Sequence, residues 1–156
     1  LLDAVSQTLE VPTTFPGGAG EFPLGTRAIE LPDENVAIAF LDVFGRPARF
    51  KACECERIDT PTLAQGLELV NSNQIQSKLS SQTGFAHRLA VNNRSPQENC
   101  ELIFLTLYGR AGTAAELEVA VAHVSGSAAA DESDKIERYR NLIWALLASN
   151  EFMFVQ

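Results

Sequence analysis

The sequence predicts an all-α fold, an irregular helical bundle with a long loop rich in proline and glycine packed on it. Three observations carry this prediction. Two segments open with capping boxes, the last long segment has apolar residues at helical spacing, and helix breakers gather between residues 10 and 35. At 156 residues, we expect a single helical domain over 1–156.

The N-terminal third is expected to be mostly irregular. Residues 1–9 are typical of the end of a helix. The following loop, 10–35, holds Pro12, Pro16, Gly17, Gly18, Gly20, Pro23, Gly25 and Pro32. A loop of this length in a compact domain is usually functional or mobile. Residues 36–44 fit a short helix or strand that Gly45 and Pro47 end.

Four helices are predicted after this loop, at about 61–80, 96–108, 114–125 and 134–149. Thr60 precedes a proline, which favours the first position of a helix. Ser95 with Glu98, and Thr113 with Glu116, form the two capping boxes. The last helix has its apolar residues about 3.6 positions apart.

Charge and composition exclude several classes of partner. Twelve basic against twenty acidic side chains give a net charge of −8, which disfavours nucleic acid and anionic lipid. The sequence has no apolar run near membrane-spanning length. Leu1 is not an initiator methionine, so we expect that a preceding segment has been removed.

The run Cys53-Glu54-Cys55-Glu56-Arg57 is the strongest candidate for chemistry, because it holds two of the three cysteines among charged residues. Cys53 and Cys55 supply two soft ligands for a metal ion; a closed structural zinc site needs four, and His87 and Cys100 are the candidates to complete the set. Alternatively, two of Cys53, Cys55 and Cys100 form a disulfide, structural or redox-active. Glu54, Glu56 and Asp59 also suit calcium. The plainest interpretation is a disulfide that pins the loop while Arg57 pairs with a carboxylate.

Other candidates are weaker. The sequence has no Cys-x-x-Cys-His haem attachment motif and no defensible Ser/His/Asp order, so no cofactor is expected beyond a possible metal ion. His87 fits a helix end or turn, and His123 lies within a predicted helix. Phe152, Met153 and Phe154 are expected to form a docking tail, seated in the core or against a neighbour.

Several ordered segments resemble the C-terminal domain of unknown function that follows cytochrome-c-like domains in large exported planctomycete proteins. The matching segments are 2–7, Pro23 to Asp33, Phe40 to Arg49 with the cysteine run, Thr60 to Gln65, Leu69 to Ser72, Leu105 to Leu117, and Leu142 to Phe152. Leu142 to Phe152 is similar to a closing "LLWALLNSKEF" motif, and Arg110 with Thr113, Glu116 and Leu117 to an "ALSR.PT..EL" helix pair. Cys100 matches nothing typical of that family.

The resemblance implies that this chain is the C-terminal part of the family domain and that the protein is exported, to the periplasm or cell surface. The family has no established activity. We therefore expect a non-catalytic scaffold or interaction module associated with cytochrome-c-like electron transfer. Its partners would be upstream domains of the same protein, such as a cytochrome-c-like domain, or another subunit. The alternative is a redox or metal-binding module, or a carbohydrate-acting enzyme, centred on Cys53–Arg57.

Overall fold

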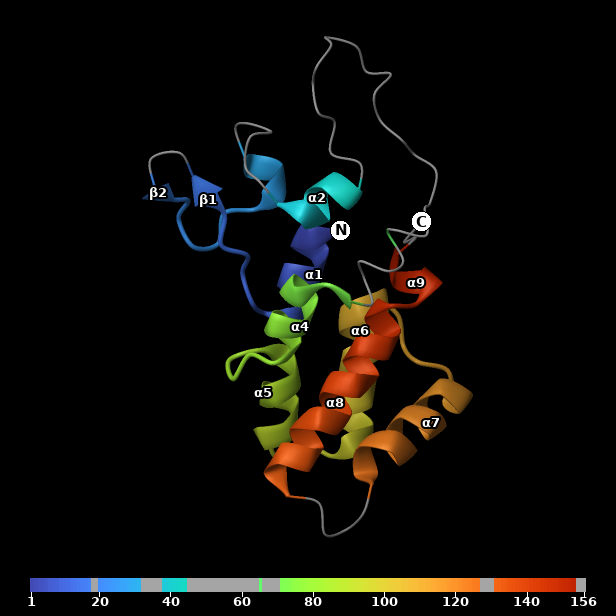
Figure 1. The fold of residues 1–156 in the computed structure, drawn as a ribbon. Helices are drawn as coiled ribbons and strands as arrows, with labels where there is room; N and C mark the ends of the chain where they lie inside the picture. Colours follow the sequence, from blue (N-terminus) through green and yellow to red (C-terminus); the bar gives the residue numbers. More distant parts are fainter. Residues whose placement is uncertain (18–19, 32–37, 45–64, 66–70, 127–130, 154–156) are drawn as a thin grey trace.

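The computed structural model describes residues 1–17, 20–31, 38–44, 65, 71–126 and 131–153 (Figure 1). In these ranges the chain is built from helices, joined by one very short antiparallel β-ribbon, so the predicted all-α fold is confirmed. The elements are α1 (Leu2–Leu9), β1 (Pro16–Gly17), β2 (Gly20–Glu21), the 3-10 helix η1 (Ala28–Glu30), α2 (Ala39–Val43), α4 (Asn73–Leu79), α5 (Phe85–Val91), α6 (Pro96–Tyr108), α7 (Ala114–Ser125), α8 (Glu132–Leu147) and α9 (Asn150–Met153).

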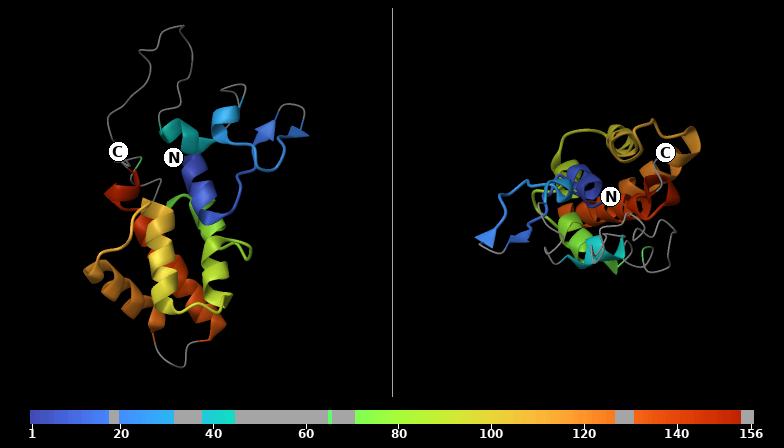
Figure 2. Two further views of the ribbon diagram at one scale, coloured as in Figure 1. Left: turned by 180° about the vertical axis from the view of Figure 1, so that it is seen from behind. Right: turned by 90° about the horizontal axis from the view of Figure 1, so that it is seen from above.

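Three helices form the centre of the bundle. α5, α6 and α8 run alongside one another, α7 covers one side of α6 and α8, and α9 folds back beside the end of α6 (Figures 1 and 2). α1 and α4 pack together at the same upper end of the bundle as α9, below α2, η1 and the ribbon (Figure 1). The core holds side chains from all these layers, with Val5, Cys100, Ile103 and Ile143 fully buried.

The capping boxes set the helix starts that the sequence predicts. At α6 the backbone N–H of Ser95 donates to Glu98 Oε2 over 2.8 Å, and the Glu98 N–H donates to Ser95 Oγ over 3.3 Å. The same pair of bonds joins Thr113 and Glu116 at α7. α6 and α7 therefore have the predicted bounds, 96–108 and 114–125.

Other boundaries differ from the prediction. α8 begins and ends two residues earlier than expected, because Asp131 Oδ1 accepts the N–H of Asp134 over 2.8 Å and caps the helix there. The predicted helix 61–80 is interrupted at Ser72, whose ψ of 121° is not helical. His87, expected at a helix end or turn, is the third residue of α5 and lies in the first turn of that helix.

The described part of the loop 10–35 packs on α1, as the predicted architecture requires. Phe15 is 1% exposed and anchors the loop in the core. In β1 and β2, Pro16 pairs with Glu21 and Gly17 with Gly20. Farther along, the Asp3 carboxylate of α1 accepts the N–H groups of Ala28 and Ile29 over 2.6 and 3.3 Å, and so holds the start of η1 on α1.

A buried amide joins three helices of the bundle. Asn99 is 1% exposed on α6, and its Nδ2 lies 3.0 Å from Leu89 O of α5 and 2.9 Å from Tyr139 Oη of α8. Asn92, just past α5, donates to Asn99 Oδ1 over 2.9 Å. Each polar group in this network has a partner, which is the condition for burying polar atoms at low cost.

Replacing Asn99 by alanine should destabilise the chain, because Leu89 O, Tyr139 Oη and Asn92 would lose a buried partner. We expect the free energy of unfolding to fall by roughly 1–3 kcal/mol, measured by urea denaturation. Asn93→Ala is the control, since Asn93 is exposed on the loop next to it, and a change below about 0.5 kcal/mol is expected. Equal losses in both variants would contradict this role of Asn99.

Candidate functional site

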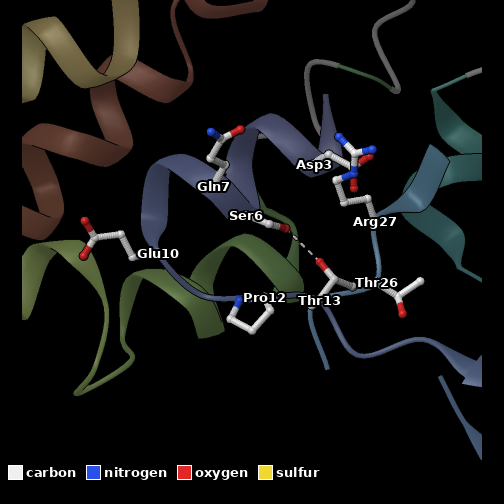
Figure 3. Close-up of a pocket in the computed structure, with 9 residues that line it drawn as sticks. Asp3, Ser6, Gln7, Glu10, Pro12, Thr13, Thr26 and Arg27 are labelled. Carbon is white, nitrogen blue, oxygen red and sulfur yellow. Dashed lines mark hydrogen bonds between the residues drawn. The ribbon is translucent and has the colours of Figure 1, made fainter. Parts of the chain in front are cut away.

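A polar pocket of about 420 Å³ lies between the outer face of α1 and the loop that folds back on it (Figure 3). Its lining residues are Asp3, Ser6, Gln7, Glu10, Pro12, Thr13, Gly25, Thr26 and Arg27. Ser6 and Gln7 are three and four positions after Asp3, and Glu10, just past the end of α1, is four and three positions after them, so these residues share one face. The loop supplies the opposite wall.

Hydrogen bonds to α1 fix both ends of this wall. Asp3 holds η1, as described above, and Ser6 Oγ lies 2.9 Å from Thr13 Oγ1. Beyond the C-terminal end of α1, Arg88 Nε of α5 donates to Glu10 Oε2 over 2.8 Å. The pocket is therefore largely preformed, which is typical of small-ligand sites.

Lys78 supports the same loop from inside the bundle. Its side chain is 5% exposed, and Nζ donates to Val11 O over 2.6 Å, one residue before the pocket wall begins. Burial lowers the pKa of Lys78 to about 8, because the ammonium ion loses its hydration there. Burying a lysine with one carbonyl acceptor costs free energy, because a single hydrogen bond does not replace the hydration that the ammonium ion loses.

The pocket offers a ligand hydrogen bonds rather than a reactive pair. Asp3 already accepts from η1, Ser6 and Thr13 bond to each other, and Glu10 accepts from Arg88 of α5. Within the described residues, the side-chain amide of Gln7 and the two terminal nitrogens of Arg27 make no side-chain bond, since Arg27 Nε alone donates to Glu30 Oε1. These groups suit carbonyl or carboxylate oxygens of a ligand or a partner chain.

A second polar cluster lies at the other side of the bundle, around Arg110. All five N–H donors of its guanidinium are used. Nε and Nη2 donate to Glu151 over 2.6 and 2.8 Å, Nη1 and Nη2 donate to Glu116 over 3.0 and 2.9 Å, and Nη1 also donates to Ala111 O over 3.1 Å. The guanidinium also lies 5.3 Å from the centre of the Tyr108 ring.

This cluster combines one positive charge with two negative charges. Hydrogen bonds from Arg110, followed by those from Thr113, lower the pKa of Glu116 to about 2. Hydrogen bonds from Arg110 also lower the pKa of Glu151, and the two carboxylates raise the pKa of Arg110. The three charges stay ionised at neutral pH and join the end of α6, the start of α7 and α9.

A groove of about 610 Å³, with an apolar floor and a charged rim, opens between α6 and α7. It is lined by Arg94, Glu98, Glu101, Leu102, Leu105, Ala111 and Leu117. Leu105 lies on the floor of this groove and is 58% exposed.

The predicted cysteine site is only partly within the described residues. Cys53, Glu54, Cys55, Glu56 and Arg57 all lie outside them, as does Asp59. Cys100 is a fully buried free thiol in this structure, and its candidate disulfide partners Cys53 and Cys55 lie outside the described residues. Burial in the core, with Glu101 next to it, raises the pKa of this thiol to about 11. The pairing of Cys53 with Cys55 stays a prediction.

The histidines lie apart from any ligand cluster among the described residues, where no group of three or more His, Cys, Asp and Glu side chains could hold a metal ion. His87 is half-buried on α5, and its proposed co-ligands Cys53 and Cys55 are not described. His123 is exposed near the end of α7, with Nε2 3.2 Å from Arg138 O, while Arg138 Nη1 donates to His123 O over 3.2 Å. This exchange ties α7 to α8.

The expected C-terminal tail is partly a core element. Phe152 on α9 is 5% exposed and belongs to the core, and Met153 is half-buried against it. Phe154 lies outside the described residues. Of the two places considered for the tail, Phe152 therefore occupies the core.

Comparisons with known proteins identify no relative: no family model, no curated protein and no solved structure matches this chain. The resemblance to the planctomycete-type domain consequently stays a prediction. No helix among the described residues has the length and apolar character needed to cross a membrane.

Changing Lys78 to methionine should alter how stability depends on pH. The pKa of Lys78 is about 8 when folded and near 10.5 when unfolded, so between these values the unfolded chain binds more protons. The wild type should therefore gain roughly 1–3 kcal/mol of unfolding free energy, relative to Lys78→Met, as pH rises from about 7 to about 10.

Chemical denaturation over this pH range measures the effect. Lys135→Met is the control, because Lys135 is exposed on α8 and its removal should leave the profile parallel to that of the wild type. A parallel profile for Lys78→Met as well would show that Lys78 titrates alike in the folded and unfolded chains.

Proposed function

We propose that this chain is a non-catalytic scaffold or interaction module of an exported planctomycete-type protein associated with cytochrome-c-like electron transfer. The observation that carries the proposal is that the side chains of each polar cluster form hydrogen bonds between different parts of the fold. Arg110 has every donor engaged by backbone or by carboxylates of α7 and α9. Asn99 does the same between α5, α6 and α8.

The polar pocket follows the same pattern. Asp3 forms a hydrogen bond with η1, Ser6 with the loop, and Glu10 with Arg88 of α5. Clusters at catalytic sites are typically arranged around a group held ready for substrate. Here the described clusters stabilise the arrangement of helices and loops, which favours a role in presenting surfaces to a partner.

The exposed apolar side chains favour the same role. Leu105 lies within a groove, and Leu24, Ile29 and Val119 are each more than two-thirds exposed at 75%, 79% and 72%. Single exposed apolar residues are ordinary, but an apolar groove in a folded chain is typical of an interaction site. The net charge of −8 favours a partner that carries positive charge.

The partner and compartment in this proposal come from the sequence resemblance. A cytochrome-c-like domain of the same protein is the first candidate partner, in the periplasm or at the cell surface. The redox, metal or carbohydrate-acting alternative depends on the run Cys53–Arg57, which the structure does not describe.

A binding measurement tests the proposal. The purified chain is mixed with a separately produced cytochrome-c-like domain of the same protein, and the masses in solution are followed by size-exclusion chromatography with light scattering. We expect a complex with the summed mass of the two parts. Because the interaction includes charge, its dissociation constant should rise with salt.

The opposing outcome is separate elution combined with chemistry at the cysteines. Native and denaturing mass spectrometry with thiol alkylation would reveal it, as a mass increase of one metal ion that denaturation removes. Under the scaffold proposal we expect one disulfide between Cys53 and Cys55 and no added metal. Cys100 should then be alkylated only after unfolding, because it is fully buried.

A further inference from the structure

α6 carries apolar side chains on two faces. Ile103, Phe104 and Leu107 point into the core and are at most 5% exposed. Leu105 is 58% exposed on another face, and Leu102 beside it is half-buried. Leu102 of this second stripe packs against the edge of the core, so Leu105 is the side chain that the fold leaves uncovered on this face.

The second stripe forms the floor of a groove with fixed walls. Leu102 and Leu105 lie one turn apart, and Ala111 and Leu117 close the groove from the loop and from α7. The bonds of Arg110 to Ala111 O and Glu116, and the capping box of Thr113, hold this loop in place. The groove is therefore preformed, and its volume of about 610 Å³ has room for several large side chains.

The rim of the groove carries more negative than positive charge. Glu98 and Glu101 line it against the single cation Arg94. Glu98 is kept ionised because the N–H and hydroxyl of Ser95 both donate to its carboxylate. Glu101 accepts only from Gln97 Nε2 over 2.8 Å among the described residues, which leaves it able to pair with a cation.

Helical geometry connects these observations. A groove between two helices accepts the ridge of a third helix, whose side chains at i, i+3, i+4 and i+7 fill it. Acidic residues beside an apolar floor are complementary to a ridge flanked by lysine or arginine. The net charge of −8 acts in the same direction at longer range.

We propose that the groove between α6 and α7 is the docking surface for a basic amphipathic helix of a partner protein. This inference rests on the proposed function, for which it names the surface and the chemistry of the partner. Leucine-like side chains of the partner fill the space over Leu102, Leu105 and Leu117. Its basic residues pair with Glu98 and Glu101, while Arg94 disfavours a cation at its own end of the groove.

Two designed peptides test the inference with the full chain. Both are about 15 residues long and have leucines at helical spacing, flanked by lysine in one and by glutamate in the other. Fluorescence anisotropy measures the binding of each labelled peptide. We expect the lysine peptide to bind at least about tenfold more tightly than the glutamate peptide, with a preference that shrinks as salt is added.

Three variants locate the site. Leu105→Asp should weaken binding of the lysine peptide by roughly tenfold or more, because it places a charge on the apolar floor. Val119→Asp is the matched control: Val119 is 72% exposed on α7 but outside the groove, so binding should stay within about twofold. Glu101→Lys should lower the preference for lysine over glutamate. Circular dichroism checks that each variant is folded.

The inference is wrong if neither peptide binds, if both bind equally, or if Leu105→Asp and Val119→Asp behave alike. It is also wrong if Leu105→Asp converts a dimer of this chain into a monomer, since a second copy would then cover the groove. These failures are separate from that of the proposed function. A complex with the cytochrome-c-like domain that Leu105→Asp leaves intact would keep the interaction role and reject this surface.

Discussion

The arrangement of the C-terminal half depends on the guanidinium of Arg110. It follows Gly109, whose φ of 68° ends α6 and turns the chain so that Arg110 can reach both α7 and α9. Its partner Glu116 is also the third residue of α7 and closes the capping box with Thr113, so one carboxylate sets a helix start and anchors the bridge. The loop fixed in this way forms one wall of the apolar groove.

The other polar contacts also join separate elements of the fold, at different depths of burial. Asp3 holds η1 at the surface, Lys78 holds the loop just after α1 from a buried position, and Asn99 joins three helices in the core. The cost of burying a polar group rises as it loses water, so the deeper groups need more complete bonding. Asn99 meets this requirement with several partners, whereas Lys78 has one carbonyl and a lowered pKa.

Local signals in the sequence predicted much of the fold and little of the site. Ser95, Thr113 and their glutamates act within three residues, and they set α6 and α7 correctly. The Arg110–Glu151 bridge joins residues 41 positions apart in the sequence, and the Asp3–Ala28 bond that closes the pocket joins residues 25 positions apart. Neither contact can be predicted from a local sequence pattern. The polar spacing of Asp3, Ser6, Gln7 and Glu10 was the available signal for the pocket. α5 was missed because its start at Gly84 has no side-chain cap.

The central claim is that the charged clusters of this chain bind its own elements together, and a double-mutant cycle between Arg110 and Glu151 tests it most directly. Urea denaturation gives the unfolding free energies of the wild type, Arg110→Gln, Glu151→Gln and the double variant. If the bridge holds α9 on the bundle, the double variant loses clearly less stability than the two single losses added together. Strictly additive losses would contradict this account, because they would mean that the two side chains are close but do not stabilise each other.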